Sequence, residues 1–136
     1  MSSLITPLIT CVLALSPAPN DIKNFQSCMV EERQVEVVMK WRPLVEIYFQ
    51  DKDIVKAMRI IYCESRGKPT AVGINKDKTK DVGLWQFNDN TWEWLRNKLN
   101  INSPRTNPRV ATAVASWLVY NDGWHHWNSS KHCWSN

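Results

Sequence analysis

The segment from Val110 to Tyr120 constrains the fold most, because almost every residue in it is apolar or small. Asn107 and Pro108 before it are typical of a helix start, and Gly123 after it is typical of a helix end. A helix that is apolar on nearly every side must be surrounded by other elements, so we expect it at the centre of a domain. The chain has 136 residues, which suits one such domain and leaves little room for a second core.

A second helix is predicted between residues 54 and 65, where apolar residues recur at helical spacing and define one buried face. Asp53 is expected to cap this helix, and Gly67 and Pro69 are expected to end it. Residues 30–50 mix apolar and charged positions and predict one or two further helices. Pro43 is compatible with the first turn of one of them.

Between these helices the pattern changes to β-forming residues around a polar tip. Ala71 to Phe87 contains the run KDKTK at residues 76–80, with apolar residues on both sides, and predicts a small hairpin with a solvated turn. Asn90, with Glu93 three residues later, resembles a capping box that opens a helix through Leu99. Together the elements predict an α+β fold in which helices dominate.

The apolar stretch from Leu4 to Leu15 is shorter than the span of about 20 residues that crosses a membrane. The small residues Ser16 and Ala18 follow it, as a signal-peptide cleavage site requires, although the first basic residue is Lys23. We therefore expect residues 1–19 to be a signal peptide and residues 20–136 to be a single domain. An apolar N-terminal segment that is never removed is the alternative.

The four cysteines are Cys11, Cys28, Cys63 and Cys133, and none has the C-x-x-C spacing of a zinc or redox site. A structural disulfide is the sharper interpretation, and free buried thiols are the alternative. We favour a bridge between Cys63 and Cys133, which would stabilise the fold by about 4 kcal/mol in the chain-entropy account. Removal of residues 1–19 would leave an odd number of cysteines.

The net charge of +4 favours an anionic partner, and wall polymer, membrane surface and nucleic acid all qualify. The chain also contains eight Trp residues, whose flat rings stack on sugars or bases and also build cores. The basic residues do not gather into one stripe, which disfavours nucleic acid. Core positions are expected for Trp41, Trp85 and Trp117, and sugar contacts for Trp92 and one of Trp124 or Trp127.

Glu64 is the first candidate for catalysis, because it lies in the last turn of the predicted helix at the edge of its apolar face. Partial desolvation and the negative end of the helix dipole both raise the pKa of such a carboxyl. A proton donor that works near neutral pH needs this shift. From its position alone, a solvated Glu64 paired with Arg66 remains the alternative.

Asp81 provides a second carboxylate on the predicted second strand of the hairpin. A helix end that faces a hairpin strand can place two carboxyl groups on opposite sides of a groove. Cleavage of glycosidic bonds uses such a pair: one group protonates the leaving oxygen, and the other stabilises or captures the positive sugar carbon. The spacing permits this chemistry.

The segment around these two carboxylates resembles the c-type lysozymes. Its residues match the pattern ES…A…N…D…D-x-G-x-x-Q-x-N…W without a gap; they are Glu64, Ser65, Ala71, Asn75, Asp77, Asp81, Gly83, Gln86, Asn88 and Trp92. The shorter core ES…A…GLWQF…TW is similar to lytic transglycosylases and phage endolysins of the lysozyme-like superfamily. Two positions depart from the c-type pattern, because Val82 replaces its Tyr and Arg59 replaces a half-cystine.

The resemblance implies a lysozyme-like fold with a small β-hairpin wing beside a catalytic groove. It implies that Glu64 is the general acid, that Asp81 is the second catalytic carboxylate, and that no cofactor or metal takes part. The predicted substrate-binding residues are Ser65, Asp77, Gln86, Asn88 and Trp92. The C-terminal segment is similar to small bacterial and phage muralytic domains, in which a cysteine can meet one near the catalytic Glu. This supports the bridge between Cys63 and Cys133 by analogy.

The function that these expectations favour is a muramidase, which cleaves the β-1,4 bond between N-acetylmuramic acid and N-acetylglucosamine. The alternatives are a lytic transglycosylase that leaves 1,6-anhydro ends and a wall-binding or virion module without turnover. The expected partner is the peptidoglycan glycan strand, with no nucleic acid and no stable membrane insertion once the leader is removed. We expect a secreted or extracytoplasmic monomer, with association to a virion or envelope left open.

Three histidines near the end of the chain raise the question of a metal site. They are His125, His126 and His132, and Asp122 adds a possible oxygen ligand. Their spacing matches no structural zinc site, and surface loops often contain His, so we predict no metal here.

Overall fold

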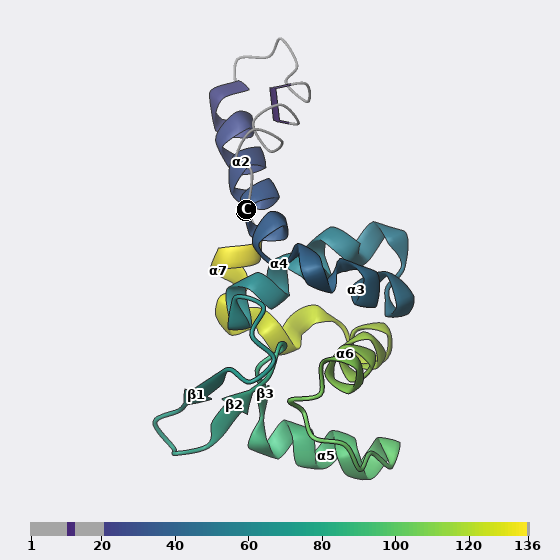
Figure 1. Ribbon diagram of the computed structural model, residues 1–136. Coiled ribbons are helices and arrows are strands. Elements are labelled where there is room, and N and C mark those ends of the chain that lie inside the picture. Colours follow the sequence, from purple (N-terminus) through teal and green to yellow (C-terminus); the bar gives the residue numbers. More distant parts are fainter. Residues whose placement is uncertain (1–10, 13–20, 136) are drawn as a thin grey trace.

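The computed structural model describes residues 11–12 and 21–135. The helices are α2 (Asp21–Val37), η1 (Met39–Trp41), α3 (Arg42–Tyr48), η2 (Asp51–Asp53), α4 (Ile54–Ser65), α5 (Asp89–Leu99), α6 (Pro108–Asp122), η3 (Trp124–Ser130) and α7 (Lys131–Trp134). The strands are β1 (Val72–Ile74), β2 (Lys80–Val82) and β3 (Phe87–Asn88). Helices dominate and the sheet is small, which confirms the predicted α+β class (Figure 1). Within the described ranges, no helix combines the length and apolar character needed to cross a membrane.

Helix α4 lies at the centre of the molecule, with α2 and α3 on one side and the sheet and α5 on the other (Figure 1). It is buried on more than one face, because Ile60 is fully buried in addition to the predicted face of Ala57, Met58 and Ile61. Helix α6 contributes to the core through Ala111, Val114, Ala115, Leu118 and Val119, but it packs beside α3 and η3 and leaves Ala113 and Trp117 partly exposed, so the predicted central position belongs to α4 instead. The two most apolar helices therefore form the framework on which the other elements pack.

The predicted hairpin is present and gains a third short strand, so the sheet has the order β1-β2-β3 with antiparallel pairing. Asp81 is central in it, because it pairs with Gly73 on one side and Asn88 on the other. Gly83 follows β2 with φ +93°, and a Cβ there would clash with the backbone carbonyl of Arg105. The position requires glycine, since both the backbone angle and the close approach exclude a side chain.

The two predicted helix caps have different outcomes. The cap at Asn90 is wrong, because α5 begins one residue earlier and its N-cap is Asn88, whose side-chain oxygen accepts a hydrogen bond from the Asn90 N–H at 3.1 Å. Asp53 is the N-cap residue of α4, as predicted, and the helix begins at Ile54. Its side chain makes no capping bond, because the carboxylate accepts a hydrogen bond from the Tyr120 hydroxyl at 2.8 Å.

The cysteines form two disulfides, Cys63–Cys133 and Cys11–Cys28, and none of the four is free. The predicted bridge between Cys63 and Cys133 is confirmed, and it joins α4 to α7. The predicted signal peptide lies outside the described residues apart from Cys11 and Val12, so its removal stays a prediction. Cleavage at residue 19 would remove Cys11 and leave Cys28 without its partner.

Candidate active site

A cavity of about 190 Å³ lies between the end of α4, the sheet and η3. It brings Glu64 and Asp81 together, although they come from different elements. Its wall also includes two residues of the predicted substrate-binding set, Gln86 and Asn88. The full lining is Glu64, Asp81, Trp85, Gln86, Phe87, Asn88, Thr91, His126, Trp127 and Ser129. The arrangement agrees with the groove between helix end and hairpin strand that the sequence predicts.

Glu64 lies in the last turn of α4 and is half-buried. Burial raises the pKa of its carboxyl above the ordinary value of 4.5, because desolvation disfavours the charged form. The nearby Asp81 raises this pKa further by charge repulsion. Both effects favour a protonated Glu64 at a pH where an exposed Glu would be ionised.

Ser130 opposes this rise in the pKa of Glu64. Its hydroxyl donates a hydrogen bond to Glu64 Oε2 at 2.8 Å. This bond favours the carboxylate and lowers the pKa of Glu64, although burial remains the larger effect. The indole N–H of Trp134 lies 3.2 Å from Ser130 Oγ and donates to it. Trp134 is itself buried, so the hydroxyl that faces Glu64 is held by a rigid neighbour.

The segment that carries Ser130 is fixed to α4 by further contacts. The bridge between Cys63 and Cys133 begins at the residue before Glu64. The buried side chain of Gln34, on α2, donates to the backbone carbonyl of Cys133 at 3.0 Å and accepts from Arg59 Nε at 2.7 Å. Arg59, which occupies a half-cystine position of the c-type lysozymes, therefore helps to join α2, α4 and α7 by hydrogen bonds.

Asp81 has a polar environment. Its Oδ1 accepts hydrogen bonds from the side-chain amides of Asn75 at 3.1 Å and Asn88 at 2.9 Å. Each of these amides also lies within hydrogen-bond distance of Thr79 Oγ1. The Thr79 hydroxyl in turn donates to Asp77 at 2.6 Å. The carboxylate of Asp81 is thus oriented by two donors that belong to the sheet and its tip.

Asn88 links this network to a helix. Its amide nitrogen contacts Asp81, while its oxygen caps α5. One side chain therefore fixes both the start of α5 and the orientation of the second carboxylate.

The floor of the cavity is aromatic. Trp85 is fully buried, and its ring lies 5.4 Å from that of Trp127, whose indole N–H donates to the Trp85 carbonyl at 3.0 Å. Trp85 also donates to Thr112 on α6 at 3.1 Å. Of the two C-terminal candidates for sugar stacking, Trp127 lines the cavity and is almost completely buried.

Three predicted substrate-binding residues lie outside the cavity lining. Trp92 is only 8% exposed and packs against Phe87, with ring centroids 5.4 Å apart. Ser65 is buried and accepts a hydrogen bond from the Gly67 N–H at 3.1 Å, which stabilises the end of α4. Asp77 lies at the exposed tip of the hairpin. Their roles in substrate binding stay predictions.

Gln86 lines the cavity with a positive φ of 51°. Its amide donates to the carbonyls of Ala71 and Gly83, both at 3.0 Å, and so holds the turn between β2 and β3.

No sequence pattern pointed to Ser130, Trp134 or the cavity position of His126. All three lie in the C-terminal segment, far along the chain from Glu64. The signal that could have found Ser130 is the predicted disulfide: a residue one helical turn before Cys133 must lie near the residue that follows Cys63. A second cluster, formed by Asp122, His125 and His126, lies at one side of the cavity and is described below.

The fold and the paired carboxylates define the lysozyme-like class. A family model of the transglycosylase SLT domain matches residues 50–127, more than half of the chain, and the protein therefore belongs to this family. Comparison with curated proteins and with solved structures gives no match. The matched residues include both carboxylates and end before Ser130.

Family membership supports a lysozyme-like enzyme that acts on peptidoglycan, as a glycosidase or as a lytic transglycosylase. A peptidoglycan substrate and two disulfides are compatible with an extracytoplasmic location.

Proposed function

We propose that this protein is a muramidase that hydrolyses the β-1,4 bond between N-acetylmuramic acid and N-acetylglucosamine. The observation that carries the proposal is the pair of carboxylates in one cavity, each in a different environment. Glu64 is desolvated and its pKa is raised, whereas Asp81 accepts two amide hydrogen bonds. Glycoside hydrolysis requires one carboxyl group that donates a proton and a second that stabilises positive charge.

In the first step, protonated Glu64 donates its proton to the glycosidic oxygen while the bond from that oxygen to C1 breaks. Positive charge develops at C1, and the carboxylate of Asp81 stabilises this charge. The amides of Asn75 and Asn88 keep Asp81 oriented during this step.

In the second step, water adds to C1, and Glu64, now a carboxylate, accepts the proton that the water loses. The Ser130 hydroxyl donates to Glu64 Oε2 and stabilises the carboxylate between the two steps. The products are a strand with a reducing N-acetylmuramic acid end and a strand with a free hydroxyl at the other side of the cleaved bond.

The second candidate is a lytic transglycosylase, and the family match favours it. Here the 6-hydroxyl of the muramic acid attacks C1 in place of water, and Glu64 accepts its proton. The product end is a 1,6-anhydro ring. Asp81 is then dispensable, because a single residue acts as acid and then as base.

The products distinguish the two reactions. Purified protein is incubated with insoluble peptidoglycan, and the released muropeptides are analysed by mass. We expect reducing ends from the wild-type protein and a loss of about a thousandfold in release rate from Glu64→Gln, because the general acid is removed. Glu93→Gln, which changes an exposed carboxylate on α5, is the matched control and should keep the wild-type rate.

If the released muropeptides carry 1,6-anhydro ends, and Glu64→Gln no longer releases them, the protein is a lytic transglycosylase and not a muramidase. If the wild-type protein binds peptidoglycan but releases no muropeptides over a range of pH and salt, the protein is a wall-binding module. We further propose that the protein acts as a secreted or extracytoplasmic monomer.

A further inference from the structure

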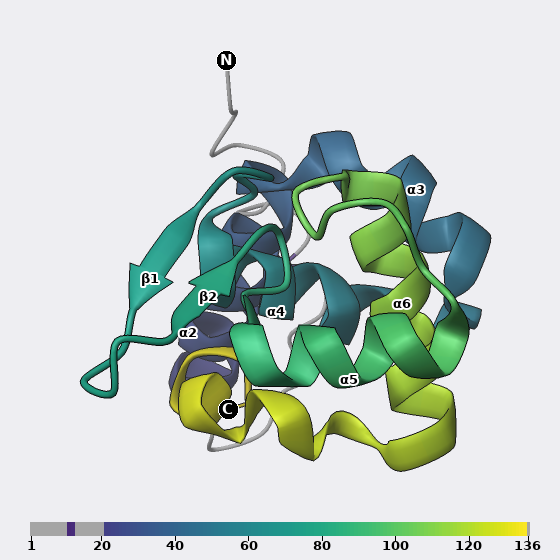
Figure 2. The same ribbon diagram turned by 90° about the horizontal axis from the view of Figure 1, so that it is seen from below.

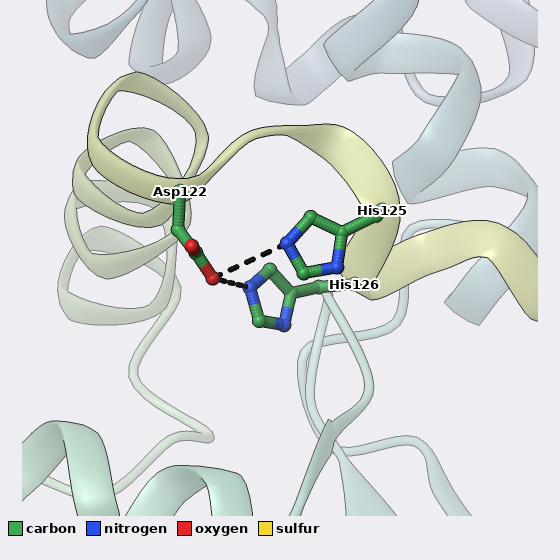
Figure 3. Close-up of side chains that lie close together, drawn as sticks. All are labelled: Asp122, His125 and His126. Carbon is green, nitrogen blue, oxygen red and sulfur yellow. Dashed lines mark hydrogen bonds and ion pairs between the residues drawn. The ribbon is translucent and has the colours of Figure 1, made fainter.

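Asp122, His125 and His126 gather at the C-terminal end of α6 (Figure 3). Asp122 is the last residue of the helix, and both imidazole rings point toward its carboxylate. Asp122 Oδ2 lies 3.2 Å from His125 Nε2 and 2.6 Å from His126 Nε2. One ligand atom from each residue lies within 4.8 Å of the other two.

The backbone explains this convergence. Gly123 ends α6 with φ +93°, and η3 begins at the next residue, so the chain turns back across the helix end. The turn places the side chains three and four residues after Asp122 over its carboxylate. The negative end of the α6 dipole adds to the attraction for a cation at this place.

Although the sequence spacing predicts no metal here, we propose from this geometry that Asp122, His125 and His126 bind a divalent transition metal ion of the zinc type. Two imidazole nitrogens and one carboxylate oxygen form a donor set that suits Zn²⁺. Ligand atoms that share a tetrahedral zinc at the usual bond lengths lie about 3.3 Å apart. The 3.2 Å between Asp122 Oδ2 and His125 Nε2 agrees with this spacing, whereas the 2.6 Å between Asp122 Oδ2 and His126 Nε2 is shorter, so the His126 ring moves away from the carboxylate when both bind one ion.

Solvent can complete the coordination. The side chains of Asp122, His125 and His126 are 49%, 57% and 23% exposed, so water can reach the fourth position and the rings can adjust. All four cysteines are in disulfides, which leaves no thiol to compete for zinc.

The site adjoins the cavity, because His126 also lines it together with Glu64 and Asp81. A metal ion held by this ring would place a positive charge beside the groove. Zinc should therefore slow glycan cleavage, a consequence that rests on the proposed function, whereas metal binding itself does not.

Isothermal titration of the full chain with zinc chloride tests the site. We expect one zinc per chain, with the affinity reduced about tenfold or more in His125→Ala and in Asp122→Asn, because each variant loses one of three ligands. His132→Ala changes the remaining histidine, which lies outside the cluster, and should bind zinc as the wild type does. Mg²⁺ should not compete, because it prefers oxygen ligands.

Absence of saturable zinc binding would overturn the proposal, and so would equal affinity in the wild type and His125→Ala. Circular dichroism confirms that each exposed-residue variant is folded.

Muropeptide release with and without zinc tests the consequence for the groove. Inhibition that is weaker in His125→Ala supports the coupling, and binding without inhibition overturns it. If the wild type releases nothing, the proposed function has failed, while the titration still decides the metal site.

Discussion

Glu64 lies on a wall of the cavity built from helices, whereas Asp81 lies on a wall built from a small sheet, and the contacts of the two carboxylates differ accordingly. On the helical wall, Glu64 is partly buried and accepts one hydrogen bond from a hydroxyl group. The sheet wall offers Asp81 two amide donors. The two carboxyl groups of one cavity therefore have different surroundings, although both belong to the same small domain (Figure 2).

The largest expected effect is a loss of stability when the disulfide of the helical wall is removed. Replacing both Cys63 and Cys133 by Ser should lower the free energy of unfolding by about 4 kcal/mol, because the bridge closes a loop of 70 residues. Urea denaturation measures the change. Replacing Cys11 and Cys28 is the matched control: the cavity lining comes from other elements, so release of muropeptides by the folded control should stay unchanged. Equal stability of the first variant and the wild type would contradict the prediction.

The sheet wall is tested by Asp81→Asn, which preserves shape and removes charge. We expect the rate of muropeptide release to fall about a hundredfold, because the positive charge at C1 loses its stabilising partner. Asp51→Asn, an exposed residue of η2, is the control. A near-normal rate in Asp81→Asn would remove the basis for a two-carboxylate mechanism and favour the transglycosylase.

Ser130→Ala separates the two influences on Glu64, because it removes the hydrogen bond to the carboxylate and leaves the carboxylate buried. We expect kcat to fall about fivefold, which corresponds to the loss of one hydrogen bond. Since that bond lowers the pKa of Glu64, its loss raises the pKa, and the alkaline limb of the pH–rate profile should move to higher pH. A uniform loss at every pH would indicate a structural role only. Ser135→Ala, an exposed neighbour, is the control.

The smallest expected effect is the change in stability that follows replacement of Glu64. Because the folded protein raises the pKa of Glu64 above its unfolded value, the stabilising contribution of this group is present at low pH and lost as pH rises through the folded pKa. Glu64→Gln should therefore increase the free energy of unfolding at pH 8, and by progressively less toward pH 4. Denaturation at both pH values measures it, with Glu93→Gln as reference. An increase of equal size at both would contradict the assigned cause.

The predictability of the two walls also differs. The sheet wall lies within residues 71–88, so short-range patterns sufficed to predict the hairpin and to place Asp81 on its second strand, while the resemblance to the c-type lysozymes placed Asn88 beside it. On the helical wall the same patterns found Glu64 but not Ser130, because 66 residues separate them and only the folded chain brings them together. The cap at Asn90 was misplaced because a strand end, invisible in local spacing, starts α5 earlier.

The distance along the chain between Glu64 and Ser130 has a consequence for the order of synthesis. Both carboxylates have been synthesised once residue 81 has been added, but the hydroxyl, the cysteine and the tryptophan that complete the environment of Glu64 come only with residues 130, 133 and 134. A chain interrupted between these points would carry both carboxylates without the contacts that hold the environment of Glu64. The surroundings of Glu64 are therefore complete only after the last helix has been synthesised and has docked.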